Sequence, residues 1–191
     1  MQAVIDRYGT ALQFGKTFNP SMQNEYARKY HDRCFIGHAP SLNLVIDAYG
    51  DDVCKGWLML QLKNVNLAAG GSDPNKKMTP EQIADTAETI MANYPALKVS
   101  ELMLFFSQFK AGKYGRFYGA IDSMVITEAL SKFLEYRQQE MVRITREMDK
   151  AKAEAAREAR RHEKTMSLDE YLAQHGDKLT EDQKLFIKKF M

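Results

Sequence analysis

The chain has 191 residues, with 27 Lys or Arg against 25 Asp or Glu, so its formal net charge at pH 7 is only +2. This balance excludes a protein that is basic all over, and any nucleic-acid contact has to come from a local surface. Apolar runs such as "WLML" are far shorter than the roughly 20 residues that a membrane-spanning helix needs. No charged segment leads into an apolar export signal, so we expect a cytoplasmic protein that has no membrane contact and keeps its two cysteines reduced.

Residues that start or end helices recur along the first half of the chain. The first 20 residues mix glycine, threonine and aromatics and end in "NPS", which predicts a turn before a short helix over 22–33. Ser41 is placed to cap a helix that ends at Gly50, and a more buried helix follows over 51–71. "TPEQ" at 79–82 is a capping box with proline at the first helical position, and Pro95 stops the helix that it starts.

The second half continues the pattern. Ser100 is expected to open a helix that glycines close near residue 112, and Asp122 or Ser123 to cap the longest helix, which runs to about residue 162. "SLDE" at 167–170 and "TEDQ" at 180–183 are two further capping boxes. The prediction is an all-α protein with a compact helical body over 1–135, a charged helical arm over 136–164 and short terminal helices over 165–191.

One turn, "KAGKYGRFYG", combines cations, aromatics and glycines between two apolar runs. Cations contact phosphates, flat rings stack on unpaired bases, and glycines allow a close backbone approach. The same residues also suit a solvated rim at a helix C-terminus, with the aromatics pinning the turn to the core. The predicted nucleic-acid contacts, to DNA or RNA, are Lys110, Lys113, Tyr114, Arg116 and Tyr118.

The predicted arm carries a heptad pattern, with steps of four and three residues alternating from Leu130 to Glu158. Such a seam faces a partner helix, from a protein partner or a second copy of the chain. The alternatives are a solvated single helix or one that packs back on the body. The residues expected to meet a partner are Met141, Ile144, Met148, Ala151 and Ala155.

Signals for metal and catalytic chemistry are weak. His31, Cys34, His38 and Cys54 have the right number and softness for tetrahedral zinc, but their spacing matches no known pattern, and a buried free thiol is the common alternative. "GKYGRFYG" lacks the spacing and the preceding strand of a phosphate-binding loop. With no nucleophile elbow or HExxH motif either, we expect a non-enzymatic protein without a cofactor.

The segment from Tyr94 to Arg137, above all "GKYGRFYG", resembles a family of small uncharacterised proteins from Bacteroidota prophages and mobile elements. The resemblance covers about a quarter of the chain. It implies a mobile-element setting, in which replication accessories, helicase-loading factors, host-interaction proteins and virion parts occur. It brings no activity and no catalytic residues.

Two functional hypotheses follow from the sequence. The first is a nucleic-acid-associated accessory protein of a prophage or mobile element, with the basic-aromatic turn on phosphates and bases. The second is a protein-interaction or structural assembly component that acts through the long helix. The first predicts binding that weakens with salt, and the second predicts assembly that depends on concentration.

Overall fold

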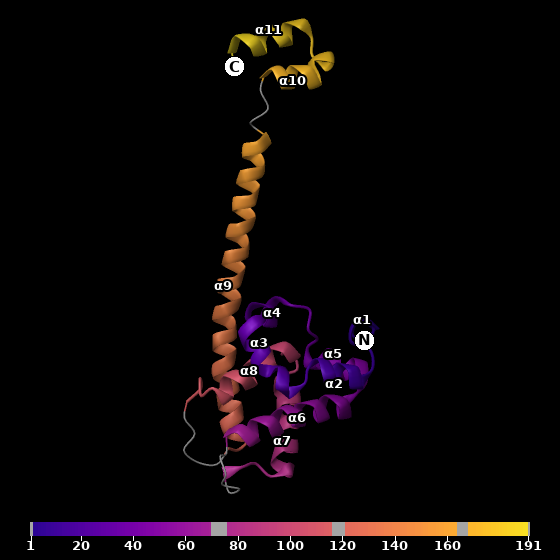
Figure 1. Cartoon of the computed structure of the whole chain (residues 1–191), viewed down its shortest axis with the longest axis vertical. Helices are drawn as coiled ribbons and strands as arrows, with labels where there is room; N and C mark the ends of the chain where they lie inside the picture. Colours follow the sequence, from indigo (N-terminus) through magenta and orange to yellow (C-terminus); the bar gives the residue numbers. More distant parts are fainter. Residues whose placement is uncertain (1, 70–75, 116–120, 164–167, 191) are drawn as a thin grey trace. The chain divides into compact units, whose positions relative to one another are not determined.

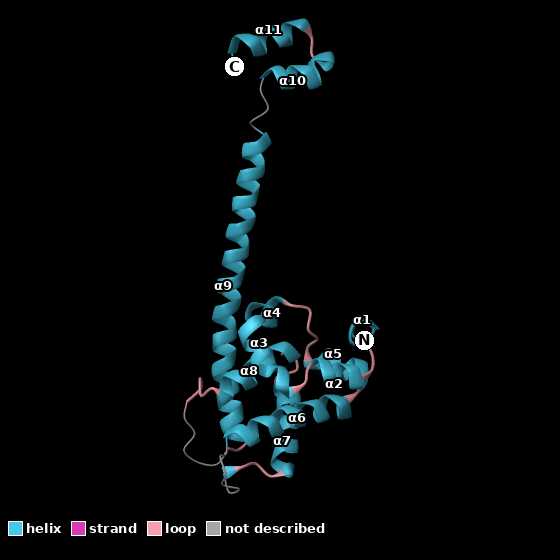
Figure 2. Cartoon of the chain, in the orientation of Figure 1, coloured by secondary structure: helices cyan, strands magenta, loops and turns pink. Residues whose placement is uncertain are grey.

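The structure is a computed structural model that describes residues 2–69, 76–115, 121–163 and 168–190. Every regular element within these ranges is a helix (Figure 2), so the predicted all-α class is confirmed. Ser41 and Lys98 form an isolated antiparallel bridge outside the helices. Within the same ranges, no helix combines the length and the apolar character that crossing a membrane requires.

The chain divides into two compact units, residues 1–142 and residues 143–191, and the long helix α9 (Ser123–Glu163) contributes to both. Figure 1 labels the other α-helices of the first unit, and its colours follow the chain. In chain order, the helical elements before α9 are α1 (Gln2–Tyr8), α2 (Ala11–Thr17), the 3-10 turn η1 (Pro20–Met22), α3 (Gln23–Lys29), α4 (His31–Ile36), α5 (Leu42–Tyr49), α6 (Asp51–Ala69), α7 (Pro80–Asn93) and α8 (Val99–Lys110).

Helix α8 is the centre of the first unit, since every residue from 99 to 107 is buried. It packs against α3, α4 and α6, which surround it in Figure 1. Its Phe105 ring lies 5.6 Å, centroid to centroid, from Phe133 of α9, and Phe133 in turn stacks 6.4 Å from Phe35 of α4. A helix that is apolar nearly all round belongs in a core, and the aromatic chain across it links α4, α8 and α9.

Most predicted helix signals are confirmed at the atomic level. The Thr79 hydroxyl accepts from Gln82 N at 3.3 Å, and the Gln82 side chain accepts from Thr79 N at 2.8 Å, which completes the capping box. Asp122 Oδ1 accepts from Val125 N at 2.9 Å at the start of α9. Gly50 ends α5 with φ of +89°, a left-handed conformation that favours glycine.

Two predictions about the first unit are corrected, and two helices occur where none was predicted. The single helix expected over 22–33 breaks at Tyr30, whose φ of −121° separates α3 from α4. Helix α8 begins before Ser100, because Glu101 caps the backbone N–H of Lys98 at 2.9 Å while the Ser100 hydroxyl donates to Cys34 O. The first 20 residues form α1 and α2, and the capping box of Thr10 with Gln13 that starts α2 is visible in the sequence.

The second unit contains the end of α9, followed by α10 (Leu168–His175), the 3-10 turn η3 (Gly176–Lys178) and α11 (Glu181–Phe190). The predicted capping box at Thr180 is confirmed, with Thr180 N donating to Gln183 Oε1 at 3.0 Å and Gln183 N donating to Thr180 Oγ1 at 3.4 Å. The start of the box predicted at 167–170 lies outside the described residues.

Candidate functional site

The two lysines of the predicted basic-aromatic turn are engaged by neighbouring groups of the first unit. Lys110 Nζ donates to Asn64 Oδ1 at 2.8 Å, and burial lowers the pKa of this amine. Lys113 Nζ lies 3.2 Å from the centroid of the Tyr136 ring, a cation–π contact, and burial lowers its pKa as well. Both ammonium groups therefore already have partners where the sequence predicted phosphate contacts.

The prediction that Tyr114 stacks on a base is wrong, because the residue is buried. The residue is only 8% exposed, its hydroxyl donates to Gln108 Oε1, and its ring lies 5.6 Å from Phe105. Burial raises the pKa of its phenol. Tyr114 thus pins the turn to the core and offers little ring area to a base. The other two predicted contacts, Arg116 and Tyr118, lie outside the described residues.

The predicted zinc set does not form. Cys34 and Cys54 are fully buried, and burial raises the pKa of each thiol to about 12. A zinc ligand has to be a thiolate, and apolar burial opposes that state. Among the described residues, the possible metal ligands that do come together are His31, Asp32 and Glu140.

The five residues predicted to meet a partner helix differ in how buried they are. Ile144 is 3% exposed and Met141 is half-buried, whereas Met148, Ala151 and Ala155 are exposed. Ile144 is therefore unavailable to a partner helix, which corrects that part of the prediction. Only the last three of these positions remain open.

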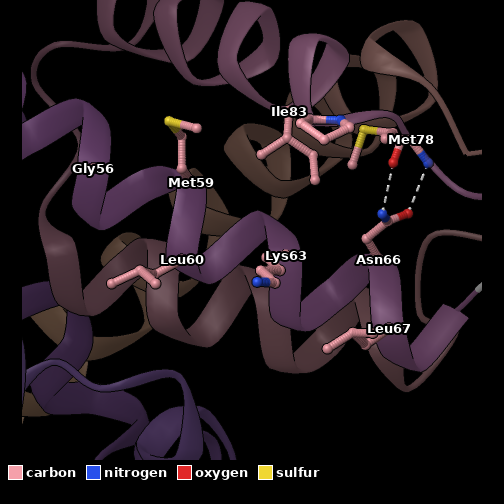
Figure 3. A pocket seen from close by; sticks show the side chains of 9 residues that line it. Gly56, Met59, Leu60, Lys63, Asn66, Leu67, Met78 and Ile83 are labelled. Atoms are coloured by element: carbon pink, nitrogen blue, oxygen red, sulfur yellow. Dashed lines mark hydrogen bonds between the residues drawn. The ribbon is translucent and has the colours of Figure 1, made fainter.

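An apolar groove of about 490 Å³ lies between α6 and the start of α7 (Figure 3). The Asn66 side chain fixes its far end, since Nδ2 donates to Met78 O at 3.0 Å and Met78 N donates to Oδ1 at 2.9 Å. Among the described residues that line it, Lys63 is the one charged residue, so this lining suits apolar contacts. The lining residues are Gly56, Met59, Leu60, Lys63, Asn66, Leu67, Met78, Pro80 and Ile83.

A second hollow, of about 470 Å³, has a different character because aromatic and cationic side chains line it. We call it the tyrosine–arginine hollow. Its lining comes from α1, α3, α4, α8 and the segments between helices, and none of the described lining residues is acidic. The lining residues are Arg7, Tyr8, Phe18, Tyr26, Tyr30, Arg33, Ile36, Gly37, His38, Ala39 and Ser100.

The aromatic rings of the hollow form one connected group. Phe18 is 1% exposed and lies 5.3 Å from the Tyr8 ring and 6.0 Å from the Tyr26 ring, while Tyr30 lies 5.9 Å from Tyr26. Burial raises the pKa of Tyr8, and it raises the pKa of Tyr26 to about 12. At neutral pH these hydroxyls are therefore uncharged and able to donate hydrogen bonds.

Two guanidinium groups stand beside these rings. Arg7 lies 5.9 Å from the centroid of Tyr8 and Arg33 lies 6.0 Å from that of Tyr30. Both arginines are exposed, and in the described part of the chain neither has a carboxylate within ion-pair distance. Cations that keep their charge available, next to stacked rings, suit a ligand with both a phosphate and a flat ring.

The base of the hollow is held from beneath by α6. Trp57 Nε1 and Gln61 Nε2 both donate to Phe18 O, at 2.9 and 2.8 Å, and Gln23 Nε2 donates to Gln61 Oε1 at 2.7 Å. All three bonds are buried. They fix the chain segment between α2 and α3, and so they set where Phe18 and Tyr26 of α3 lie.

The tyrosine–arginine hollow was not predicted, although the sequence contains the pattern of residues that forms it. "EYARKYHDR" interleaves tyrosines and cations in the same way as the turn that was chosen, and "DRY" at 6–8 repeats the pairing of arginine with tyrosine. The glycines near residue 112 favoured the turn. The structure shows that Tyr114 of the turn is buried, whereas the tyrosines of the hollow are half-buried. The composition of a short segment does not reveal this difference.

The model of a family of unknown function, DUF6633, matches residues 77–184. The chain belongs to this family. The matched region begins just before α7 and ends within α11, so all residues that line the hollow except Ser100 lie outside it. No curated protein and no solved structure matches the chain.

Proposed function

We propose that this protein is a non-enzymatic nucleic-acid-associated protein that binds single-stranded DNA or RNA at the tyrosine–arginine hollow. The proposal keeps the mobile-element accessory role that the sequence resemblance implies, and it moves the contact from the turn to α1, α3 and α4. One observation carries it: three tyrosines and two arginines line the hollow, and none of the described residues that line it is acidic.

The chemistry divides between two kinds of side chain. Arg7 and Arg33 contact phosphates, while a base stacks on the exposed part of Tyr30 or Tyr26. Stacking on an aromatic side chain is worth about 1–3 kcal/mol per base and tolerates any sequence, because every base has a π-face. With two phosphates neutralised, the logarithm of the affinity should fall with the logarithm of salt at a slope of about −1.4.

Fluorescence anisotropy with labelled single-stranded DNA and RNA tests this proposal. The Arg7→Gln/Arg33→Gln variant should bind at least about tenfold more weakly than the wild type at low salt, with a shallower salt slope. The matched control is Lys16→Gln/Lys76→Gln, which removes the same charge from exposed positions outside the hollow and should keep most of the affinity. Equal losses in both variants, or no binding by the wild type, would contradict the proposal.

A protein-interaction role is the second candidate, because every residue from 145 to 161 of α9 is exposed. Ion pairs along this stretch, such as Lys150 with Glu154 at 3.9 Å, stabilise a helix by only about 0.2–0.5 kcal/mol each. A bound partner helix would add packing that this stretch lacks.

The apolar surface of that stretch limits how strong such an association is. Burying Met148 contributes about 1.5–3 kcal/mol, and Ala151 and Ala155 contribute less. We therefore expect weak self-association, with a dissociation constant of about 10⁻⁴ M or above. Sedimentation velocity over a concentration series measures it. Met148→Lys should remove any dimer, and a dimer that survives this change would place the interface elsewhere.

A further inference from the structure

A cluster of metal-ligand side chains joins α4 to α9 within the first unit. His31 Nδ1 lies 2.9 Å from Asp32 Oδ1 and 4.0 Å from Glu140 Oε2. One ligand atom from each of the three residues lies within 4.8 Å of the others. His31 and Glu140 come from segments more than 100 residues apart in the chain, so the fold itself assembles the group.

These spacings are close to those of a metal site. Zinc ligands of the histidine and carboxylate type lie about 2.0–2.2 Å from the ion, so two of them are at most about 4.4 Å apart. The distance from His31 to Asp32 and that from His31 to Glu140 already fall below this limit. A side-chain movement of less than about 1 Å brings the third distance within it.

The other ring nitrogen of His31 is held by the protein. Nε2 lies 2.5 Å from the hydroxyl of Tyr136, a residue one helical turn from Glu140 on α9. A metal-bound histidine ordinarily makes a hydrogen bond through its second nitrogen, which fixes the ring orientation. The Asp32 carboxylate accepts from Nδ1–H, so an ion that binds Nδ1 takes the place of this proton, and Nε2–H then donates to Tyr136.

Charge also favours a cation here. Two carboxylates so close together repel each other, and positive charge between them stabilises the arrangement. Lys113 supplies part of it, since its ammonium interacts with Glu140 and lies over the Tyr136 ring. A metal ion bound between the carboxylates would supply more.

We propose that His31, Asp32 and Glu140 bind one divalent transition-metal ion, with Mn²⁺ and Zn²⁺ the best matches to one imidazole and two carboxylates. Water completes the coordination shell. The ion ties α4 to α9, and it stabilises the first unit in proportion to its occupancy. This proposal is independent of the nucleic-acid proposal.

Titration of the full chain with Mn²⁺ alone, followed by electron paramagnetic resonance, tests the site, and Zn²⁺ serves as a competitor. We expect one bound ion per chain that Zn²⁺ displaces. His31→Ala and Glu140→Gln should each weaken binding about tenfold or more. The matched control is Glu135→Gln, an exposed carboxylate on the same helix, which should change nothing. Circular dichroism establishes that each variant folds.

The Lys113→Met variant tests the site while all three proposed metal ligands stay in place. Taking the ammonium away from Glu140 should make Mn²⁺ bind roughly three to ten times more tightly, because like charges no longer repel. The proposal would be overturned if the wild type bound neither Mn²⁺ nor Zn²⁺, or if His31→Ala and Glu140→Gln bound Mn²⁺ as tightly as the wild type does. The cluster would then be a metal-free polar contact between α4 and α9.

Discussion

Arg137 of α9 forms an ion pair with a fully buried carboxylate, since its Nε lies 2.7 Å from Glu101 Oε1. The second oxygen of Glu101 accepts from Lys98 N at 2.9 Å and closes the capping box of α8. One buried side chain thus starts the central helix and attaches α9 to it. In the heptad pattern Arg137 is an interruption, and this contact explains why an arginine stands there.

Arg137→Met should lower the free energy of unfolding by about 3 kcal/mol, because it leaves the Glu101 charge buried and unpaired. Adding Glu101→Gln should restore much of the loss, since glutamine still closes the capping box without a charge. Urea denaturation measures both changes. The control is Arg143→Met, which breaks an exposed pair with Glu147 and should cost under about 0.5 kcal/mol. Equal costs at the two arginines would contradict this account.

The two cysteines should be inert in the folded protein. Burial raises the pKa of each thiol from 9.0 to about 12, so almost no thiolate exists at pH 8. Deprotonation is harder in the folded state, and the thiols therefore contribute stability below pH 9 that is lost as the pH rises from 9 to 12. Ellman's reagent should label Cys34 and Cys54 only after guanidinium chloride is added. Rapid labelling of the native protein would disagree with their burial.

Gln61→Leu should affect both stability and the hollow. The change removes a donor to Phe18 O and leaves the Gln23 amide without its acceptor, at a cost of about 1–3 kcal/mol. Because these bonds hold the segment under the hollow, nucleic-acid affinity should fall too, although Gln61 is buried and touches no ligand. Anisotropy at a temperature where the variant is fully folded separates the two effects. Unchanged affinity would show that the hollow does not need this support.

The lysines of the turn should matter little for nucleic-acid binding. Lys110 and Lys113 are held by Asn64 and Tyr136, so Lys110→Ala/Lys113→Ala should change the affinity by less than about threefold. Tyr114→Ala should instead destabilise the protein by about 3 kcal/mol, because a buried aromatic side chain is removed. Thermal unfolding measures the second effect. A large loss of affinity in the double lysine variant would return the site to the turn.

Local signals made much of the fold predictable. Thr79, Asp122 and Thr180 cap their helices as expected, because a cap depends on residues within one turn of each other. Apolar positions that recur at the 3.6-residue helical period marked the buried helices for the same reason. The break at Tyr30 was not predictable, since no glycine or proline marks it and both α3 and α4 pack on α8, which is distant in the sequence.

The candidate site was less accessible from sequence. The hollow joins Arg7 and Tyr8 to Tyr30 and Arg33 across more than 20 residues, and its depth depends on Phe18 being held by Trp57 and Gln61. The turn carries the same mixture of residues, but Tyr114 faces the core. Tertiary packing decides which tyrosine is covered and which cation keeps its charge available, and a residue pattern alone does not record that choice.

Cross-linking locates the bound strand most directly. Ultraviolet irradiation of the protein with single-stranded oligothymidine, followed by trypsin digestion and mass spectrometry, identifies the peptides that touch the bases. The account predicts cross-links at Tyr26 and Tyr30, in the peptides 17–28 and 30–33. Cross-links confined to residues 110–118 or to the 145–161 stretch, with none in 17–33, would contradict it and assign the bases to another surface.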